Sequence, residues 1–350
     1  MGAVLSLVEP VALSTLTTMQ VGGTPKSLVR CESTDQLYEA AKTAWLSDEK
    51  HHILAGGSNT VFADDMSEWN IVLVANTGIE IVTETDETVT LRVQAGESWD
   101  GFVQWCVERG YAGVEAMSGI PGSVGATPVQ NVGAYGQDVS QVITQIEFLD
   151  ATSHEVSIKP AEFFEFSYRD SALKRGLKGV IGWVEFKLYK LGGLSVPMAS
   201  GQITNHVGAE YGSQLPLSQV RDAVIELRSS KGMVIRESDS NSRSCGSFFT
   251  NPVVSSIKAL EFPDDMQKWK MDDGESMKLS AGWLIENAGI PKGYSIPGSK
   301  AAVSKKHALA ITNTGGASAA EIVELARFIQ ERVSARWGMN LLPEPNLIGF

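Results

Sequence analysis

Glycine residues recur through one stretch of the chain, GIPGSVGATPVQNVGAYG, which occupies positions 119–136. Small or turn-forming residues stand between the glycines, so the stretch fits neither an amphipathic helix nor an ordinary strand. Glycine permits a positive φ and lets backbone N–H groups approach a ligand closely, which is how glycine-rich loops hold phosphates. The stretch predicts a large, anionic, nucleotide-like ligand, and its alternative is a buried cluster of turns.

A second glycine-centred loop, Gly56-Gly57-Ser58-Asn59, lies well before the first. Further along, FFEFSYRDSALKRGLKG contains Arg169, for which two interpretations compete. The arginine either pairs with Asp170 at the surface or presents its planar guanidinium to an oxyanion. The local sequence does not choose between them.

Polar residues gather again in RESDSNSRSCG, positions 236–246, which leads into SFFTNPVV. Ser247 and Asn251 flank two phenylalanines there, and polar loops of this kind commonly carry site residues. Arg228 and Lys231 close a preceding helical pattern, where the helix dipole alone would explain two cations.

Composition limits the class of protein. With 350 residues the chain suits two or three domains, and no uncharged apolar run approaches the roughly 20 residues that span a bilayer. A formal net charge of -12 opposes non-specific binding to nucleic acid. We therefore expect no membrane insertion and no nucleic-acid partner, and an anionic ligand would need a locally basic site.

The three cysteines, Cys31, Cys106 and Cys245, are scattered and form no C-x-x-C. Neither a disulfide framework nor a metal site is expected, and a reducing cytoplasm fits best. Cys106 shares the apolar face of a predicted helix, which favours a place in the core over a role as nucleophile.

The elements that must position these residues can be predicted from capping residues and periodicity. Helices are expected after Ser33 or Thr34, after Ser98, from Pro216 with Ser218 as N-cap, and from Ser318, where Glu321 completes a capping box. Strands are expected over residues 27–31, 71–75, 89–93, 143–149 and 180–188. The chain has neither a G-x-G-x-x-G after a strand nor a Walker A sequence, so loops that suit a nucleotide point to a non-Rossmann flavin fold.

Five motifs then occur in one order: GGSN at 56–59, IPGSVGATPVQNVGAYG at 120–136, YRDS at 168–171, GSFFTNPVV at 246–254 and PEPNLIG at 343–349. Together they strongly resemble the UDP-N-acetylenolpyruvoylglucosamine reductase (MurB) family, over nearly the whole chain. The resemblance implies an α+β, three-domain FAD-binding fold of the vanillyl-alcohol-oxidase (PCMH) type. Its expected parts are a first FAD-binding subdomain at 1–78, to which the tail 345–350 returns, a second at 79–226, and a substrate-binding domain at 227–344.

The resemblance also implies an activity: NADPH-dependent reduction of the enolpyruvyl group of a UDP-sugar to UDP-N-acetylmuramate through bound FAD. Such an enzyme would be a cytoplasmic monomer that serves peptidoglycan synthesis, and hence cell shape and division. Arg169 would meet charge that develops on the substrate carboxylate, and Ser247 would deliver a proton. Glu344 would act near the same carboxylate, either protonated or by orienting another donor.

Contacts follow from the same resemblance. Lys231 and Asn251 match residues that contact the substrate and its diphosphate, and Arg228 is a candidate for flavin or phosphate contact. The expected FAD loops comprise Gly56, Gly57, Ser58, Asn59, Gly122, Ser123, Gly125, Ala126, Thr127, Asn131, Gly133 and Ala134.

Three positions depart from the family pattern. Ser200 stands where a tyrosine usually covers the substrate, so Tyr211 on the same segment is the expected replacement. His307 occupies a position where glutamine is common, and an imidazole replaces one amide hydrogen bond but not two. Cys245 precedes Gly246-Ser247 where a small inert residue is usual, which would place a thiol near the site.

Two functions of other classes stay open. An FAD-dependent oxidase could share the fold, but it commonly carries a flavin-attaching His or Cys, and neither occurs between Gly56 and Asp64. A non-catalytic flavin carrier would have no reason to keep Arg169, Ser247 and Glu344 together.

Overall fold

The computed structural model describes residues 6–271 and 273–350. The chain divides into two compact units, each built from segments that are separate in the sequence. The first unit takes the chain up to Val11, Pro25–Gly57 and Ser67–Ser229, and the second takes Ala12–Thr24, Ser58–Met66 and Ser230–Phe350. The division falls inside the glycine-centred loop at residues 56–59, between Gly57 and Ser58.

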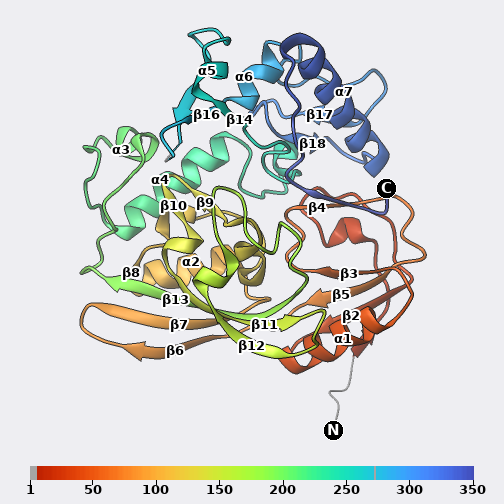
Figure 1. Cartoon of the computed structure of the whole chain (residues 1–350), viewed down its shortest axis with the longest axis vertical. Coiled ribbons are helices and arrows are strands. Elements are labelled where there is room, and N and C mark those ends of the chain that lie inside the picture. Colours follow the sequence, from red (N-terminus) through yellow and green to blue (C-terminus); the bar gives the residue numbers. More distant parts are fainter. Residues whose placement is uncertain (1–5, 272) are drawn as a thin grey trace. The chain divides into compact units, whose positions relative to one another are not determined.

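A small mixed sheet opens the first unit, in the order β1-β2-β5-β3. Its strands are β1 (Ser6–Val8), β2 (Ser27–Cys31), β3 (His51–Leu54) and β5 (Asn70–Val74). Strands β2, β3 and β5 run parallel, and helix α1 (Thr34–Leu46) lies beside them (Figure 1). Ser33 accepts a hydrogen bond from the Gln36 N–H, so the predicted N-cap is confirmed.

A larger antiparallel sheet completes the framework of the first unit, in the order β12-β11-β13-β7-β6. The strands are β6 (Ile79–Glu84), β7 (Thr88–Gln94), β11 (Ile143–Asp150), β12 (Val156–Pro160) and β13 (Gly179–Lys190), with the short β8 (Tyr111–Ala112) paired to β13. Helix α2 (Trp99–Glu108) packs against it through Trp99 and Phe102, whose rings contact Phe186. Cys106 on this helix is fully buried, which confirms its predicted place in the core.

Helix α1 packs against the larger sheet as well, because Leu37 and Ala41 share one buried cluster with Leu149 and Val180. The approach is close at Gly182, where an added Cβ would lie 2.0 Å from the Tyr38 hydroxyl. Glycine is therefore required at that point of β13.

The predicted glycine stretch forms short irregular elements on this framework. Two 3₁₀ helices, η2 (Glu115–Met117) and η3 (Val124–Gln130), precede the hairpin of β9 (Gly133–Ala134) and β10 (Gln137–Asp138). Further 3₁₀ turns are η4 (Val139–Gln141) and η5 (Ala161–Phe164), and the helices α3 (Gly201–Val207) and α4 (Leu217–Ser230) follow.

Helix α4 begins at Leu217, so the prediction that Ser218 caps it is wrong. The Val220 N–H bonds to the Pro216 carbonyl, which makes Pro216 the residue that opens the helix. Proline holds φ near the helical value without needing an N–H partner, so the helix begins two residues earlier than a cap at Ser218 would place it.

The second unit is built around α7 (Ala319–Trp337), which lies beside β17 (Ala301–Val303) and β18 (Ile311–Asn313) (Figure 1). The predicted capping box of Ser318 and Glu321 is confirmed, as is the buried stripe Ile322, Leu325, Ala326, Ile329 and Val333. The other elements are η1 (Leu13–Thr15), η6 (Ser240–Ser242), α5 (Ser256–Ala259), α6 (Ala281–Glu286), the sheet β14 (Val253–Ser255), β16 (Ser276–Leu279), β15 (Lys268–Lys270), and the parallel pair β4 (Thr60–Phe62) and β19 (Asn346–Ile348). Within the described residues, no helix is both long enough and apolar enough to cross a bilayer.

Asp64, from a distant segment, also caps α7. Its two carboxylate oxygens accept from the N–H groups of Ala319 and Ala320, at 2.8 and 3.0 Å. Replacing Asp64 with alanine leaves both N–H groups unsatisfied, so we predict that Asp64→Ala lowers the free energy of unfolding by about 1 kcal/mol. Urea unfolding followed by circular dichroism measures this change.

The control is Asp264→Ala, which removes an exposed carboxylate from the same unit. Equal stabilities for the two variants would show that Asp64 contributes nothing as a cap.

Candidate active site

Backbone meets backbone at the start of the predicted ligand loops in the first unit. An added Cβ on Gly56 would lie 2.6 Å from the Cα and carbonyl carbon of Gly122, and 2.7 Å from the Ser123 nitrogen. No real Cβ tolerates these distances, so the two glycine loops can touch only because Gly56 lacks a side chain. Two of the motifs that are far apart in the sequence are thereby brought together.

Two further glycines allow similar approaches. A Cβ on Gly125 would lie 2.5 Å from that of Ala95, and one on Gly133 would lie 2.6 Å from the Gln137 carbonyl oxygen. Asn131 between them has a φ of 46° and holds its region in place: its Nδ2 donates to Ser167 and its Oδ1 accepts from Ser140. Ala126, Thr127 and Ala134 lie in the same short elements.

The ion pair of Asp100 with Arg221 anchors the first residue of the glycine stretch, Gly119. Asp100, in the first turn of α2, accepts from the Gly119 N–H at 2.6 Å and from Arg221 of α4 at 2.7 Å. Burial acts to raise the pKa of Asp100, but the hydrogen bonds from Arg221 and Gly119 outweigh it, and the pKa is lowered. The carboxylate thus stays ionised and joins α2, the glycine stretch and α4.

Two buried polar atoms along the stretch have no hydrogen-bond partner among the described residues: the Ser123 hydroxyl and the Gln137 side-chain nitrogen. Buried polar groups are normally satisfied, and an orphan in a native fold commonly marks a place where a ligand or water binds. Both atoms belong to the segment that sequence analysis assigned to a nucleotide-like ligand. They fit a cofactor that presents hydrogen-bond acceptors there.

Arg169 is anchored to the same stretch. Its guanidinium donates to the carbonyls of Asn131, at 3.3 Å, and Gly133, at 2.5 Å. Asp170, the partner that the surface interpretation gave it, forms an ion pair with Arg175. The backbone of Arg169 has a φ of 53°, which is rare and costly for a residue with a side chain and tends to occur at functional sites.

Arg228 at the end of α4 adds a second guanidinium. Burial lowers the pKa of Arg228 to about 10, Tyr135 and Asp100 act to raise it, and Arg169 lowers it further. Arg169 and Arg228 thus lie near enough to interact electrostatically, and two such guanidinium groups suit an anionic ligand. Tyr135 was not predicted as a site residue. It lies in the GAYG motif and has a positive φ of 53°.

The second unit holds the other predicted catalytic residues. Ser247 follows Gly246, whose φ is 73°, and precedes Phe248, whose N–H bonds to the Leu309 carbonyl at 2.8 Å. The Glu344 N–H donates to the Phe248 carbonyl at 2.9 Å, so the segments that carry Ser247 and Glu344 lie side by side. The PEP and GSFF motifs are thus brought together.

Asn59 joins the same region, since its Nδ2 donates to the Glu344 carbonyl at 3.2 Å and its own carbonyl accepts from Asn346. Ser58 belongs to this unit too, and its carbonyl accepts from the Thr18 hydroxyl. The contacts place Asn59 beside the C-terminal tail and Ser58 beside Thr18.

Four residues were predicted to contact substrate, three of them in the second unit. Asn251 uses its Oδ1 to accept from the Ala281 N–H at the start of α6, while its Nδ2 makes no hydrogen bond within the described chain and can donate to an anion. Lys231 follows α4, and partly buried His307 lies in the turn between β17 and β18.

Tyr211, in the first unit, lies in a turn after α3 and is 72% exposed. Ser200 is buried at the N-cap of α3, where its carbonyl accepts from Thr204. The phenol of Tyr211 is thus outside the core, whereas Ser200 is part of the helix start.

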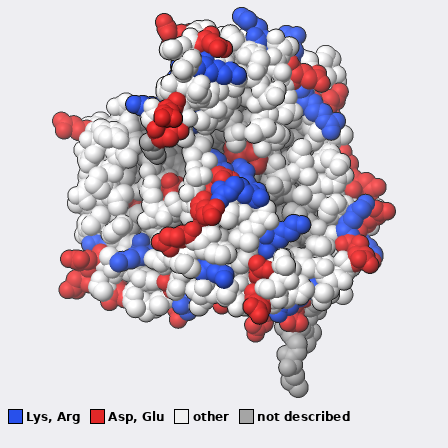
Figure 2. Space-filling model, in the orientation of Figure 1, with Lys and Arg blue, Asp and Glu red and all other residues white. Residues whose placement is uncertain are grey.

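Charge is dispersed over one face of the molecule. On the face shown in Figure 2, basic and acidic side chains are interspersed, with no continuous basic band. The basic groups that matter for an anion are therefore local ones such as Arg169 and Arg228.

Comparisons with known proteins show which family the chain resembles. A model of the FAD binding domain matches residues 25–159, and a model of the UDP-N-acetylenolpyruvoylglucosamine reductase C-terminal domain matches residues 238–348. The UDP-N-acetylenolpyruvoylglucosamine reductase of Leifsonia xyli is 42% identical, over 98% of this chain and all of the relative. That of Mycobacterium marinum is also 42% identical, over 97% of this chain and 95% of its own.

Among solved structures, the chain is similar to UDP-N-acetylenolpyruvylglucosamine reductase (MurB) from Thermus caldophilus, with a TM-score of 0.64 at 24% identity. The alignment covers 99% of this chain and 100% of that one. The expected α+β FAD-binding fold is confirmed, and FAD is its cofactor.

The residues of the first unit that fit FAD are the orphaned polar atoms of Ser123 and Gln137 and the buried guanidinium of Arg228, which would hold the cofactor beside the closely packed glycines. Such groups suit a pyrophosphate and the polar edges of an isoalloxazine ring. When bound, FAD supplies hydride chemistry that protein side chains lack.

We predict that Gly56→Ala weakens FAD binding by about 10-fold or more, because the new methyl group must displace the Gly122 backbone and open the loop contact. Quenching of FAD fluorescence by apoprotein measures the dissociation constant. Gly201→Ala is the matched control, because no atom lies within 4 Å of its added Cβ. Equal affinities for the two variants would show that the close contact of Gly56 with Gly122 does not contribute to FAD binding.

Cys245 is packed against the core of the second unit, with its sulfur 3.9 Å from the Thr60 carbonyl. Burial and the nearby Glu344 raise the pKa of the Cys245 thiol to about 12, and the Thr60 backbone lowers it slightly. Burial also raises the pKa of Cys31 to about 11 and that of Cys106 well above its usual range. The thiol near Ser247 is thus protonated rather than reactive.

Alkylation checks this directly. At pH 8 the thiolate fraction of Cys245 is roughly a thousandfold below that of an ordinary thiol, so native protein should take up almost no iodoacetamide. The same protein in urea should take up three equivalents, one for each cysteine. Rapid native labelling that Cys245→Ser abolishes would contradict the assignment.

Proposed function

Because the chain belongs to the family of UDP-N-acetylenolpyruvoylglucosamine reductases, we propose that it uses NADPH and bound FAD to reduce the enolpyruvyl ether of UDP-N-acetylglucosamine to UDP-N-acetylmuramate. The product is a precursor of peptidoglycan. The observation that carries the proposal is 42% identity over essentially the full length of both chains. Separate matches to a FAD binding domain and to the reductase C-terminal domain support it.

The reaction adds a hydride to the terminal carbon of the vinyl group and a proton to the neighbouring carbon. Hydride arrival leaves negative charge that spreads onto the substrate carboxylate. We assign Arg169 to that carboxylate, because an arginine fork binds the more electron-rich transition state better than the ground state. Its anchorage to two backbone carbonyls supports the role by restricting where the guanidinium points.

Ser247 is assigned as the proton donor, because a hydroxyl donates without prior ionisation to a strongly basic carbon. Its neighbours support the role. Gly246 at positive φ shapes the turn, and the Phe248 N–H and carbonyl are both fixed by backbone bonds. Glu344, on the segment bonded to Phe248, assists as a protonated acid or by orienting another donor.

Binding roles complete the proposal. Lys231, Asn251 and His307 contact the sugar nucleotide, and Tyr211 covers its phosphates in place of the missing family tyrosine. Residues 1–78 with the tail 345–350, and residues 79–226, serve FAD, while 227–344 serve the substrate. We propose a cytoplasmic monomer, and the three free thiols support a reducing compartment.

The activity is tested in an assay under anaerobic conditions. The protein should oxidise NADPH in stoichiometric amounts only when the enolpyruvyl sugar nucleotide is present, and it should form UDP-N-acetylmuramate. Parallel double-reciprocal lines are expected if the two substrates bind in turn. Turnover that requires O₂ and does not depend on the sugar nucleotide would identify an oxidase instead. A flavoprotein that shows no turnover in either assay would be a carrier.

Ser247→Ala should separate the two half-reactions. Reduction of the flavin by NADPH needs no proton from the serine, so its rate should stay close to that of the parent. Reoxidation by substrate should slow by about 10²–10⁴-fold, the usual effect of losing a positioned acid. Stopped-flow absorbance at the flavin band measures each half separately.

The matched control is Ser256→Ala, in which a hydroxyl bonded to the Glu275 carbonyl is lost elsewhere in the same unit. If reduction slowed as much as reoxidation in Ser247→Ala, Ser247 would be a structural residue, and Glu344 would be the next candidate for the donor.

A further inference from the structure

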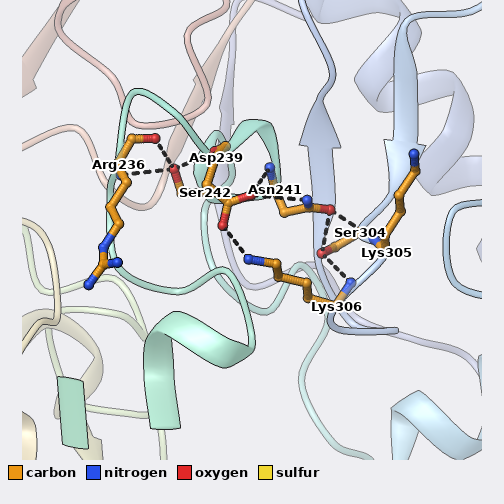
Figure 3. Close-up of polar contacts among 7 residues, drawn as sticks. All are labelled: Arg236, Asp239, Asn241, Ser242, Ser304, Lys305 and Lys306. Atoms are coloured by element: carbon orange, nitrogen blue, oxygen red, sulfur yellow. Dashed lines mark hydrogen bonds and ion pairs between the residues drawn. The ribbon is translucent and has the colours of Figure 1, made fainter. Parts of the chain in front are cut away.

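Asn241 lies in η6 (Figure 3), inside the polar loop 236–246 that directly precedes Ser247. It is partly buried, and sequence analysis gave it no role. The loop is polar throughout, but its side chains are not simply solvated: they bond to one another and to the turn after β17.

The first link of Asn241 is to the turn that carries His307. Its Oδ1 accepts from the Lys305 N–H at 2.9 Å and from the Ser304 hydroxyl at 3.3 Å. The far end of that turn is held by the bond from the Phe248 N–H to the Leu309 carbonyl. The turn is therefore attached at both ends to the segment that contains Ser247.

The second link is to the residue after Lys231. Gly232 has a φ of 69°, and an added Cβ would lie 3.0 Å from the Asn241 Cβ and 3.1 Å from its carbonyl oxygen. Gly232 therefore packs on the Cβ and backbone of Asn241, next to Lys231 in the chain. Within the described residues, the side-chain amide of Asn241 bonds only to Asp239 and to the turn that carries His307.

Asp239 orients this amide. Its Oδ1 accepts from both the backbone N–H and the Nδ2 of Asn241, each at 3.0 Å, and its Oδ2 pairs with Lys306 at 2.7 Å. Ser242 closes the loop: its hydroxyl accepts from the Arg236 N–H and lies within hydrogen-bond distance of the Asp239 carbonyl. With its Nδ2 bonded to Asp239, the Asn241 side chain directs its Oδ1 toward Ser304 and Lys305.

We propose that Asn241, oriented by Asp239, is a positioning residue that holds the turn of His307 in the place from which His307 binds the sugar nucleotide. The inference rests on the proposed function, because it concerns the binding roles assigned there. Both lone-pair directions of the Asn241 Oδ1 are used within the protein. The side chain acts through its neighbours.

Asn241→Ala tests the role. Binding contacts that are equal in ground and transition states affect KM and spare kcat, so we expect KM for the sugar nucleotide to rise about 10-fold and kcat to change less than about threefold. Reduction of the flavin by NADPH should be unchanged. Hydrogen exchange at the amides of residues 304–310 should accelerate, which is a readout independent of activity.

The loop also offers a rescue. Asn241→Asp places two carboxylates together and should impair binding, whereas the exchange Asp239→Asn with Asn241→Asp restores one amide and one carboxylate and should recover most of the affinity. Asn287→Ala is the control, since it removes an amide bonded to the Trp283 carbonyl at the end of α6. Lys306→Met, at an exposed position, should raise KM only slightly, because the bonds of Asn241 itself remain.

The outcomes are distinct. Unchanged KM and unchanged exchange in Asn241→Ala, or a fall in kcat with KM unaltered, would overturn the inference. Failure of the exchanged double variant to improve on Asn241→Asp would also count against it. A parent protein that binds FAD but never reduces the enolpyruvyl substrate would refute the proposed function, whereas faster exchange in Asn241→Ala would still show that Asn241 holds the turn.

Discussion

The contact of Gly56 with Gly122 and Ser123 is the constraint on which the first unit depends. Two loops that are distant in the sequence meet backbone to backbone, and no side chain can stand between them. The contact orders the start of the glycine stretch, which Asp100 and Arg221 tie to α2 and α4. Arg169 is then fixed by bonding to carbonyls of the same stretch.

This construction answers an electrostatic problem. A chain with a formal net charge of -12 has to hold anionic ligands. Backbone N–H groups provide positive potential without adding net charge, and Arg169 and Arg228 concentrate the remainder in a partly buried place. The cost is backbone strain at Asn131, Tyr135 and Arg169, all of which have positive φ.

Sequence predicted those features whose cause is local. The capping box at Ser318 and the stripe on α7 follow from residues three or four positions apart, and both are confirmed. The cap of α7 by Asp64 and the bonds of Asn241 to the turn after β17 depend on tertiary folding, and no spacing rule reveals them. Ser218 failed as a cap because Pro216 opens the helix first.

We propose that the glycine-lined loops bind the pyrophosphate of FAD. Binding of FAD and of riboflavin to the apoprotein, measured side by side by fluorescence quenching, tests this proposal, because both ligands carry the same ring and only FAD carries the pyrophosphate and its adenosine. We predict that FAD binds at least about 100-fold more tightly. Riboflavin affinity equal to that of FAD would contradict it and would move the binding energy to the ring.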